Sequence, residues 1–303
     1  MVDITHKSNT LRTATAQAIV KVSRQETIDA ILNKTVPKGD VFAMSKAAGL
    51  LAVKKTPDLL PDCHPLPIEF TGIDYEIDEL AIKVLVTVKT IYKTGVEVEA
   101  MHGASVVALN MYDMLKPIDK GIELFHIKLV EKKGGKSSFQ DAFKRDLKAV
   151  VIVCSDSISA GKKEDKAGKA IMVKLQECEV AVQDYIIIPD EASIIQEKAK
   201  YYQANGADLI IYTGGTGLSS RDVTPEALKP LLDRSIPGVE EAIRKYGQDR
   251  MPYAMLSRSV AGTIKNTLVL ALPGSTNGAK ESMEAIFPSI LHVFRILKGA
   301  RHD

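Results

Sequence analysis

The chain has 303 residues, which is long for one compact domain and natural for two domains of about 150 residues each. Its 40 Lys and Arg residues nearly balance 38 Asp and Glu, it contains no Trp, and aromatic residues are few. This composition excludes a strongly basic nucleic-acid-binding surface and a platform on which bases stack.

Three widely spaced cysteines, Cys63, Cys154 and Cys178, include no CxxC pair. They argue against a disulfide framework and against a structural zinc site. The sequence has neither an apolar signal-peptide core at its start nor an apolar stretch of about 18 residues. We therefore expect a cytoplasmic protein with no membrane or nucleic-acid partner.

The first half alternates between two kinds of hydrophobic pattern. Apolar residues at helical spacing predict helices over Ala14–Leu32 and His102–Lys116. Residues 80–91 alternate between apolar and polar side chains, which predicts a half-solvated strand, and Ile122–Val130 is a further strand. We expect an α+β domain in which helices cover a ferredoxin-like antiparallel sheet.

The pattern changes near residues 134–147, where a loop-like segment, Gly134–Phe139, precedes the short charged segment Gln140–Leu147. A linker here divides the chain into domains at 1–140 and 148–303. Because the linker is brief, the domains are expected to be held close together.

The second half contains continuous apolar runs separated by amphipathic segments, which predicts a parallel sheet with helices on both faces, a three-layer α/β domain. Asn205-Gly206 marks a helix end, and Pro225 suits a first helical turn capped by Thr224. The expected strands are Ala149–Cys154, Tyr185–Ile188, Leu209–Tyr212 and Leu268–Leu272, and the expected helices are Lys166–Glu177, Glu191–Asn205, Pro225–Asp233, Val239–Gly247 and Ala279–Leu297.

Polar and glycine-rich segments follow each strand of this second half, at the sheet edge where ligands of open α/β folds bind. The segments are Ser155-Asp156-Ser157, Pro189-Asp190-Glu191, Thr213–Gly217 with Arg221-Asp222, and Pro273-Gly274-Ser275. Glycines let backbone N–H groups approach a phosphate, and Asp190 and Asp222 supply hard oxygen ligands for Mg²⁺. Taken singly, the glycines could simply form a tight turn, and each aspartate could simply be a helix cap. Their convergence favours phosphoryl or nucleotidyl transfer.

The segment Thr213–Ala227, together with Pro189–Glu191, Ala254–Ala261 and Leu272–Gly278, resembles the molybdopterin adenylyltransferase family over roughly 148–300. The resemblance implies binding of Mg-ATP and molybdopterin and transfer of AMP to the pterin's terminal phosphate, with Asp190 and Asp222 as metal-binding and catalytic residues. It also implies a pterin and phosphate site made of Asp156, Gly214, Gly215, Thr216, Gly217, Gly274 and Ser275. One departure is Ala167, where many members have Ser. Because some homologues bind without efficient catalysis, a non-catalytic molybdopterin-binding module is the alternative.

In the first half, Asp113 and Lys116 lie three residues apart on a predicted helix, so both project from one face. Burial could lower the pKa of such a lysine toward a useful acid or base value, although the spacing alone also fits a weak surface ion pair. Glu97 and Glu99 are expected to share one face of a strand, or else to form a solvated edge.

The motifs Lys38–Phe42, Pro61–Leu66, Lys93–Ala100, Met111–Lys116 and Gly134–Ser137 together resemble cyclic pyranopterin monophosphate synthases, from Met1 to about Phe139. Members convert a cyclic dihydroguanosine triphosphate to the cyclic pyranopterin monophosphate and release pyrophosphate. The resemblance makes Asp113 and Lys116 the catalytic pair. It assigns a substrate pocket to Arg12, Lys38, Lys54, Asp62, Cys63, His64, Glu97, Val98, Glu99 and Lys132. Members form hexamers with sites between subunits, so we expect a homo-oligomer, a trimer or hexamer.

The sequence thus predicts a bifunctional enzyme of molybdenum cofactor biosynthesis. In each half, the scattered charged and flexible positions are expected to gather around one pocket for an anionic pterin. An unrelated nucleotide kinase is a third possibility for the second half.

Overall fold

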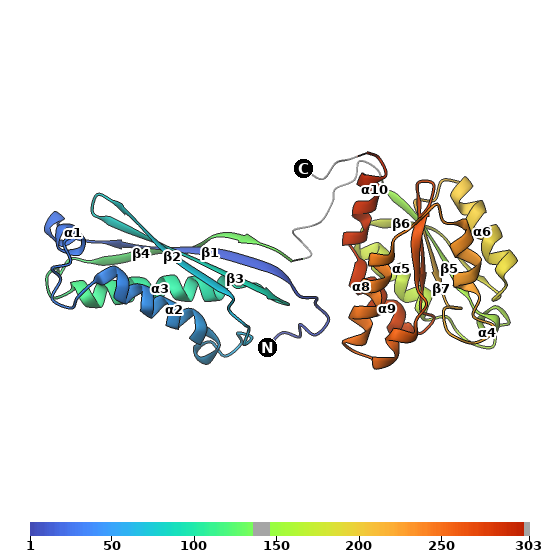
Figure 1. The fold of residues 1–303 in the computed structure, drawn as a ribbon, viewed down its shortest axis with the longest axis horizontal. Helices are drawn as coiled ribbons and strands as arrows, with labels where there is room; N and C mark the ends of the chain where they lie inside the picture. Colours follow the sequence, from blue (N-terminus) through green and yellow to red (C-terminus); the bar gives the residue numbers. More distant parts are fainter. Residues whose placement is uncertain (136–145, 300–303) are drawn as a thin grey trace. The chain divides into compact units, whose positions relative to one another are not determined.

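The computed structural model describes residues 1–135 and 146–299. The chain divides into two compact units, Met1–Phe139 and Gln140–Asp303 (Figure 1). Most of the predicted linker, and Lys136 and Ser137 of the last quoted motif, lie outside the described residues.

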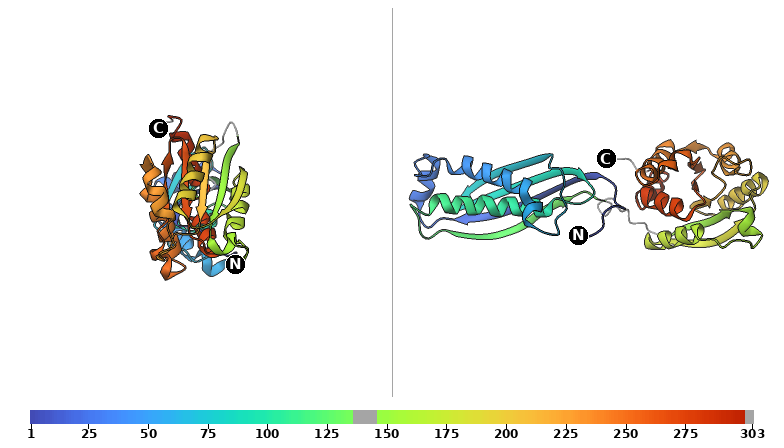
Figure 2. Two further views of the ribbon diagram at one scale, coloured as in Figure 1. Left: turned by 90° about the vertical axis from the view of Figure 1, so that its right-hand side faces the viewer. Right: turned by 90° about the horizontal axis from the view of Figure 1, so that it is seen from below.

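The first unit has an antiparallel sheet with strand order β2-β3-β1-β4, and its helices lie against one face of that sheet (Figures 1 and 2). This strand order confirms the ferredoxin-like prediction, as does a βαββαβ succession in which the first helical segment is divided into α1 and α2. The elements are β1 Thr10–Lys21, α1 Gln25–Leu32, α2 Val41–Leu59, β2 Phe70–Asp78, β3 Ala81–Tyr92, α3 Glu97–Leu115 and β4 Glu123–Lys133.

The prediction of one helix over Ala14–Leu32 is wrong, because β1 occupies most of that range and only its last part, α1, is helical. Every second residue of β1 from Ala14 to Val20 is buried, and these residues pair with Val88 to Ile82 of β3. Small alanines at i and i+4 fit a helix as well as a strand, so the pairing with β3 decides. The strand predicted over 80–91 is confirmed as β3.

Helices α2 and α3 lie side by side over the sheet and approach each other closely at glycines (Figure 1). A Cβ added to Gly49 of α2 would come within 2.4 Å of Val107 Cγ2 and 2.7 Å of Ile73 Cδ1. A Cβ on Gly103 of α3 would lie 2.6 Å from Val53 Cγ2. These two glycines therefore set the distance between the helices.

The second unit is a six-stranded sheet with order β6-β5-β7-β10-β9-β8. The four strands from β6 to β10 are parallel, and β9 and β8 are antiparallel to their neighbours, which confirms a mostly parallel α/β sheet. Its strands are β5 Leu147–Cys154, β6 Val180–Ile188, β7 Leu209–Thr213, β8 Arg234–Ser235, β9 Val260–Ile264 and β10 Thr267–Leu272.

Helices cover both faces of this sheet and give it two apolar cores. On one face α5, α8 and α9 contribute Ile171, Ile243 and Met283, and on the other α6 and α7 contribute Ile195 and Leu228. The helices are α4 Asp156–Ser159, α5 Ala167–Glu177, α6 Ala192–Ala204, α7 Thr224–Leu228, α8 Pro237–Gln248, α9 Thr276–Ile286 and α10 Val293–Ile296, with 3₁₀ segments η2 Lys229–Leu231, η3 Pro252–Leu256 and η4 Ser289–His292.

Two predicted helix boundaries in this unit are corrected. The helix expected over Ala279–Leu297 is interrupted after Ile286, where Pro288 cannot continue it, and resumes as η4 and α10. Thr224 is the first residue of α7 rather than its cap, which is Val223. Within the described residues, no helix is long and apolar enough to span a membrane.

We predict that Gly49→Leu destabilises the first unit by about 2–3 kcal/mol, because the added side chain must displace packed atoms of Val107 and Ile73. Ala47→Leu, on an exposed position of the same helix, adds the same kind of bulk and should have little effect. Calorimetric unfolding of both variants measures the difference. Equal stability of the two variants would contradict the packing described for α2 and α3.

Candidate functional site

At the C-terminal end of α3, Asp113 lies between two lysines. Its Oδ2 is 2.5 Å from Lys38 Nζ, and its Oδ1 is 2.7 Å from Lys116 Nζ. Lys116 follows directly after α3, and Lys38 precedes α2, so two separate segments of the chain meet at one carboxylate. The structure thus brings together three of the residues that the sequence singled out.

Pairing fixes the charge of these groups. Hydrogen bonds from Lys116 and Lys38 lower the pKa of Asp113 to about 2. The Asp113 carboxylate in turn raises the pKa of Lys116, which is the opposite of the lowering expected from burial. The reason is that Lys116 is exposed and paired, so the ion pair acts without a large desolvation cost. At neutral pH the site presents two ammonium groups that a carboxylate holds in place.

Glu97 and Glu99 do not lie on a strand as predicted, but in the first turn of α3. Residues two apart on a helix point in nearly opposite directions, so the two carboxylates do not share a face. Glu97 is 3.5 Å from Lys132 Nζ of β4, whereas Glu99 is buried. Acidic residues are favourable at this end of a helix because of its dipole.

The buried Glu99 accepts a hydrogen bond from the Cys63 thiol, with Sγ 3.1 Å from Oε1. Burial and the neighbouring carboxylate raise the pKa of Cys63 to about 12, so it remains a thiol at neutral pH. Burial also raises the pKa of Glu99 above its ordinary value. Cys63 therefore acts as a hydrogen-bond donor here, since a nucleophile would have to be a thiolate.

Arg12 lies near Glu97, whose charge opposes the lowering of the Arg12 pKa by burial. Its guanidinium donates to the carbonyl oxygens of Tyr92 and Lys93, each at 3.4 Å. The backbone of Gly135 passes over it so closely that a Cβ there would lie 2.1 Å from Nη1. A side chain there would have to displace the end of Arg12, and the φ of +90° at this position favours glycine.

The remaining predicted residues of the first half lie around the N-terminal end of α3 or on nearby loops. His64 Nε2 is 2.8 Å from the carbonyl oxygen of Val2, and Asp62 pairs at 3.0 Å with the amino group of Met1. Lys54 is exposed on α2, and Val98 is exposed on α3.

The predicted residues of the first half thus form two groups at opposite ends of α3. An α-helix rises about 1.5 Å per residue, so Glu99 and Asp113 lie about 21 Å apart along the axis. Within one copy of the chain they do not line a single pocket, contrary to the expectation from sequence.

In the second unit, glycines pack the ends of three parallel strands against one another. Gly214, after β7, has a φ of +102°, and a Cβ on it would lie 2.1 Å from the carbonyl oxygen of Cys154 at the end of β5. A Cβ on Gly274, after β10, would lie 2.9 Å from Gly214 Cα. Gly215 also has a positive φ, +59°. The glycines thus bring the loops after β5, β7 and β10 into direct contact.

Asp156 and Asp190, which follow β5 and β6, bind each other's backbone. Asp156 N donates to Asp190 Oδ2 at 3.0 Å, and Asp190 N donates to Asp156 Oδ1 at 3.1 Å. The other oxygen of Asp190, Oδ1, is buried with no hydrogen-bond partner within the described residues, and so is Thr224 Oγ1. Both atoms face Gly215, where a Cβ would lie 3.0 Å and 2.4 Å from them.

Burial raises the pKa of Asp190, and the charges of Asp156 and Asp222 raise it further. Asp222 lies beside the same glycine loop as Asp190, because a Cβ on Gly217 would lie 2.9 Å from Asp222 Oδ2 and one on Gly215 would lie 3.0 Å from Asp190 Oδ1. Asp222 Oδ2 accepts from Ser219 N at 2.8 Å. Three carboxylates converge on this edge, and a cation there would be stabilised.

Two arginines of the segments Thr213–Ala227 and Ala254–Ala261, to which the sequence assigned no role, also belong to this site. Arg221 donates through Nε and Nη2 to Asp156 Oδ2, at 2.9 and 2.6 Å. Arg258, before β9, donates to the carbonyl oxygens of Gly217 and Asp222 at 2.8 and 2.7 Å and pairs with Glu226. Their position within these family motifs indicated that they could have a role. No rule of sequence spacing, however, predicts which carboxylate or carbonyl oxygen an arginine will bind.

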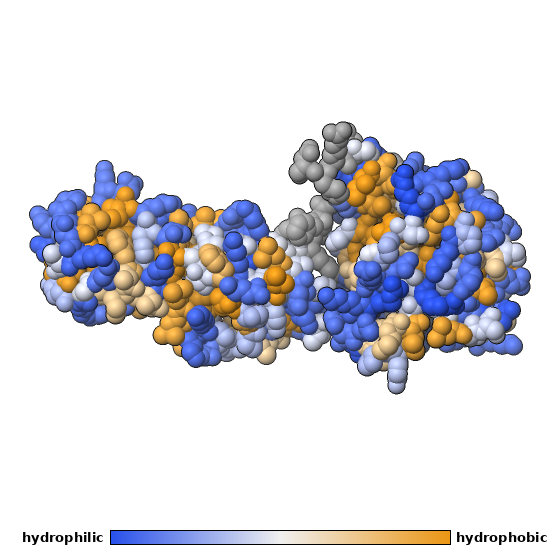
Figure 3. All heavy atoms as spheres, in the orientation of Figure 1, coloured by the Kyte–Doolittle hydropathy of each residue, from blue (hydrophilic) through white to orange (hydrophobic). Residues whose placement is uncertain are grey.

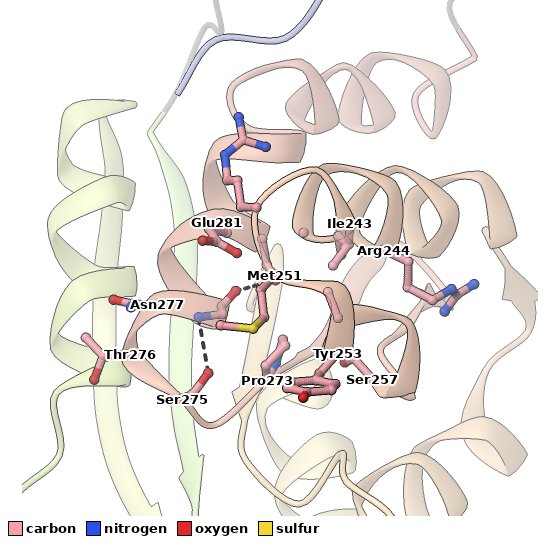
Figure 4. Close-up of a pocket in the computed structure, with 15 residues that line it drawn as sticks. Ile243, Arg244, Met251, Tyr253, Ser257, Pro273, Ser275, Thr276, Asn277 and Glu281 are labelled. Carbon is pink, nitrogen blue, oxygen red and sulfur yellow. Dashed lines mark hydrogen bonds between the residues drawn. The ribbon is translucent and has the colours of Figure 1, made fainter. Parts of the chain in front are cut away.

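A cavity of about 650 Å³ opens beside Ser275 (Figure 4). Ser275 caps α9 by accepting from Gly278 N at 3.2 Å. The walls come from α8, η3 and the start of α9, and include Tyr253, Pro273 and Glu281. The volume is typical of a pocket for a small organic ligand.

Among the described residues, no group of three or more His, Cys, Asp and Glu side chains is arranged to hold a metal ion by itself. Mg²⁺ does not require one, because it is usually bound by one or two carboxylates together with phosphate oxygens and water. Asp190 and Asp222 can supply such carboxylates.

Comparison with known proteins divides the chain in the same way. Residues 1–135 match the model of the MoaC family, and residues 150–292 match the model of a probable molybdopterin binding domain. A Molybdenum cofactor biosynthesis bifunctional protein from Chlorobaculum tepidum is 41% identical over 302 residues, covering 100% of this chain and 96% of the relative.

A protein of the same description from Synechococcus elongatus is 37% identical over 315 residues and covers 100% of this chain and 98% of the relative. A Cyclic pyranopterin monophosphate synthase from Pelobacter propionicus is 50% identical over 139 residues, which are 45% of this chain and 86% of the relative.

We predict that Glu99→Gln stabilises the protein at pH 8 and has no effect near pH 4. A carboxyl whose folded-state pKa is raised destabilises the fold increasingly as pH rises above its unfolded value, and the amide carries no such cost. Melting temperatures at the two pH values measure this, with the exposed Glu131→Gln as control. A pH-independent difference would contradict the burial described for Glu99.

Proposed function

The chain belongs to the family of bifunctional molybdenum cofactor biosynthesis proteins, and on that premise we propose that its two halves catalyse two different steps of this biosynthesis. The first half converts cyclic dihydroguanosine triphosphate to cyclic pyranopterin monophosphate and pyrophosphate. The second half binds molybdopterin and transfers AMP to it from Mg-ATP.

The observation that carries the first assignment is the arrangement of Lys38, Asp113 and Lys116. Two ammonium groups held by one carboxylate suit a triphosphate substrate and stabilise the charge that develops on departing pyrophosphate. Lys116 is kept protonated, so it can also donate a proton to the reacting substrate. Asp113 positions both lysines.

The second group, around Glu97, Glu99 and Arg12, supplies acceptors for the guanine-like edge of the substrate and further positive charge. Since Glu99 and Asp113 lie about 21 Å apart along α3, one small substrate reaches both groups only if two copies of the chain meet. We therefore assign the complete site to an interface between subunits. Exposed apolar side chains on α2 and α3, including Met44, Leu51 and Leu109, support such an assembly (Figure 3).

For the second half, the observation that most supports the assignment is Asp190 Oδ1, which is buried without a hydrogen-bond partner within the described residues and lies close to Asp222. An oxygen in this state fits a divalent cation, and Asp190 and Asp222 are the residues that would hold Mg²⁺. When bound, Mg²⁺ neutralises phosphate charge and orients the phosphates. The N–H groups of Gly215 and Gly217 can approach a phosphate closely because these residues have no side chains, whereas Gly214 N donates to the carbonyl oxygen of Leu272 at 3.2 Å.

The cavity beside Ser275 suits the pterin ring system, since its surface is mostly apolar while side chains such as Asn277 and Glu281 can bind the polar edge of a pterin (Figure 4). Pro273, Gly274 and Ser275 connect it to the glycine loop, because Gly274 touches Gly214. A pterin in this cavity would direct its phosphate toward Asp190 and Asp222.

The alternative for the second half is a module that binds molybdopterin without adenylylating it. The three converging carboxylates favour catalysis, since a holding site for an anionic pterin gains nothing from them. A nucleotide kinase would instead hydrolyse ATP or transfer phosphate in the absence of any pterin.

We predict that Lys116→Ala and Asp113→Asn each reduce pyrophosphate release from cyclic dihydroguanosine triphosphate, without added ATP, at least a hundredfold. Loss of Asp113 frees both lysines, and loss of Lys116 removes the proton donor. Lys120→Ala, an exposed lysine four residues further on, should release pyrophosphate normally.

Oligomers that contain two different inactive variants test directly whether two copies of the chain share one site. Lys116→Ala and Arg12→Ala chains, each inactive alone, should regain activity when unfolded and refolded together, because some interfaces then receive both intact groups. Near-normal activity of the single variants would remove these residues from the mechanism. Absence of recovery in proven mixed oligomers would contradict a site made from two copies.

We further predict that Asp190→Asn and Asp222→Asn lower the rate of molybdopterin adenylylation at least a hundredfold while leaving pyrophosphate release by the first half unchanged. Detection of adenylylated pterin from the full chain with Mg-ATP measures this, with the exposed Asp249→Asn as control. Pterin binding by the wild-type chain without any adenylylated product would instead support the holding module.

A further inference from the structure

Among the described residues, Arg221 is the one arginine or lysine whose side chain forms an ion pair with Asp156, Asp190 or Asp222, the carboxylate cluster of the second unit. Both of its bonds go to the same oxygen, Asp156 Oδ2. The opposite oxygen of Asp156 accepts from the backbone of Asp190. Arg221 is thus linked to Asp190 through a single intervening carboxylate.

The charges in this cluster do not balance. Asp190 lies within electrostatic reach of Asp156 and Asp222, and the Arg221 guanidinium, which bonds Asp156, also feels Asp190 and Glu191. This leaves an excess of negative charge at the place where a phosphate must bind. Asp190 in addition keeps a buried oxygen without a partner. A divalent cation would reverse this balance and compete with Arg221 for the same carboxylates.

The position of Arg221 allows it to leave Asp156. Its side chain is 60% exposed, and within the described residues its guanidinium forms hydrogen bonds only to Asp156. Arg258, in contrast, is fixed by two backbone carbonyls and Glu226 and holds the ends of the same loop. One arginine anchors the loop, and the other has a single, exchangeable partner.

We infer that Arg221 is an exchangeable cation: it neutralises Asp156 in the ligand-free protein and, when a divalent cation occupies the carboxylates, turns to bind a phosphate group of the substrate. A guanidinium is suited to both partners, since it binds carboxylate and phosphate oxygens with the same planar geometry. The phosphate belongs to the nucleotide or to the pterin. The inference rests on the proposed function of the second half and assigns it one further residue.

This exchange predicts effects of opposite sign, which a purely structural arginine would not produce. In Arg221→Gln, removal of positive charge beside three carboxylates should raise the affinity for Mn²⁺ about three- to tenfold. Loss of the guanidinium should weaken binding of Mg·α,β-methylene-ATP, or of molybdopterin, at least tenfold. Electron paramagnetic resonance of free Mn²⁺ and calorimetric titration of the full chain measure the two quantities.

Three further variants make the comparison specific. Arg221→Lys keeps the charge, so its Mn²⁺ affinity should stay near that of the wild type and its phosphate binding should be partly retained. Arg258→Gln loosens the loop and should weaken both kinds of binding. Arg234→Gln, on an exposed strand, should change neither. The ligand whose affinity falls in Arg221→Gln identifies the source of the phosphate.

The inference is overturned if Arg221→Gln weakens Mn²⁺ binding together with phosphate binding, as Arg258→Gln does, or if it leaves the affinity for both phosphate ligands unchanged. A wild-type chain that binds both ligands but yields no adenylylated pterin refutes the adenylyltransferase proposal while leaving the inference about Arg221 open to the same readouts. A wild-type chain that binds neither ligand contradicts both.

Discussion

Helix α3 carries charged side chains at both ends and packs between them against the sheet and α2. Its first turn places Glu97 and Glu99 on different sides, and its last turn places Asp113 beside Lys116. Because Gly49 and Gly103 bring α2 and α3 so close together, the helix is held rigidly and the distance between its ends is fixed. Within one copy of the chain the two charged groups of this half stay at opposite ends of the helix, which is why the complete site is proposed to form between subunits.

In the second half, charged side chains that are distant in sequence are brought together in a different way. Parallel strands end at one edge, and glycines at 214 and 274 let the loops after three strands touch through backbone atoms. Side chains that are distant in sequence, such as Asp156 and Asp190, then meet in one copy of the chain. This difference explains why one half is proposed to need a partner subunit and the other to have its catalytic carboxylates within one chain.

Much of the second unit could be predicted from sequence, because continuous apolar runs such as Ala149–Cys154 can be buried only between two layers of helices. The fold of the first unit was harder to predict from sequence. Alanines along β1 fit both helical and extended periods, and only the register with β3 decides between them. Glu97 and Glu99 were expected to share a face of a strand because they lie two residues apart, whereas both belong to the acidic first turn of a helix, where the helix dipole favours them.

Contacts between charged side chains were the least predictable. The i, i+3 spacing predicted that Asp113 would meet Lys116, but the meeting with Lys38 depends on how α2 begins. The sequence placed Asp190 and Asp222 at one edge by topology alone, whereas the bond between Arg221 and Asp156 depends on the path of a loop. Long side chains on loops have no periodic pattern from which their partners can be derived.

The central claim is that one chain performs two separate steps of molybdenum cofactor biosynthesis. Its most direct test is genetic complementation, in which the whole chain is supplied to one strain lacking only the cyclic pyranopterin monophosphate synthase and to another lacking only the molybdopterin adenylyltransferase. The account predicts that molybdoenzyme activity returns in both strains. Rescue of one strain only, with the chain expressed in both, would contradict the claim for the other half.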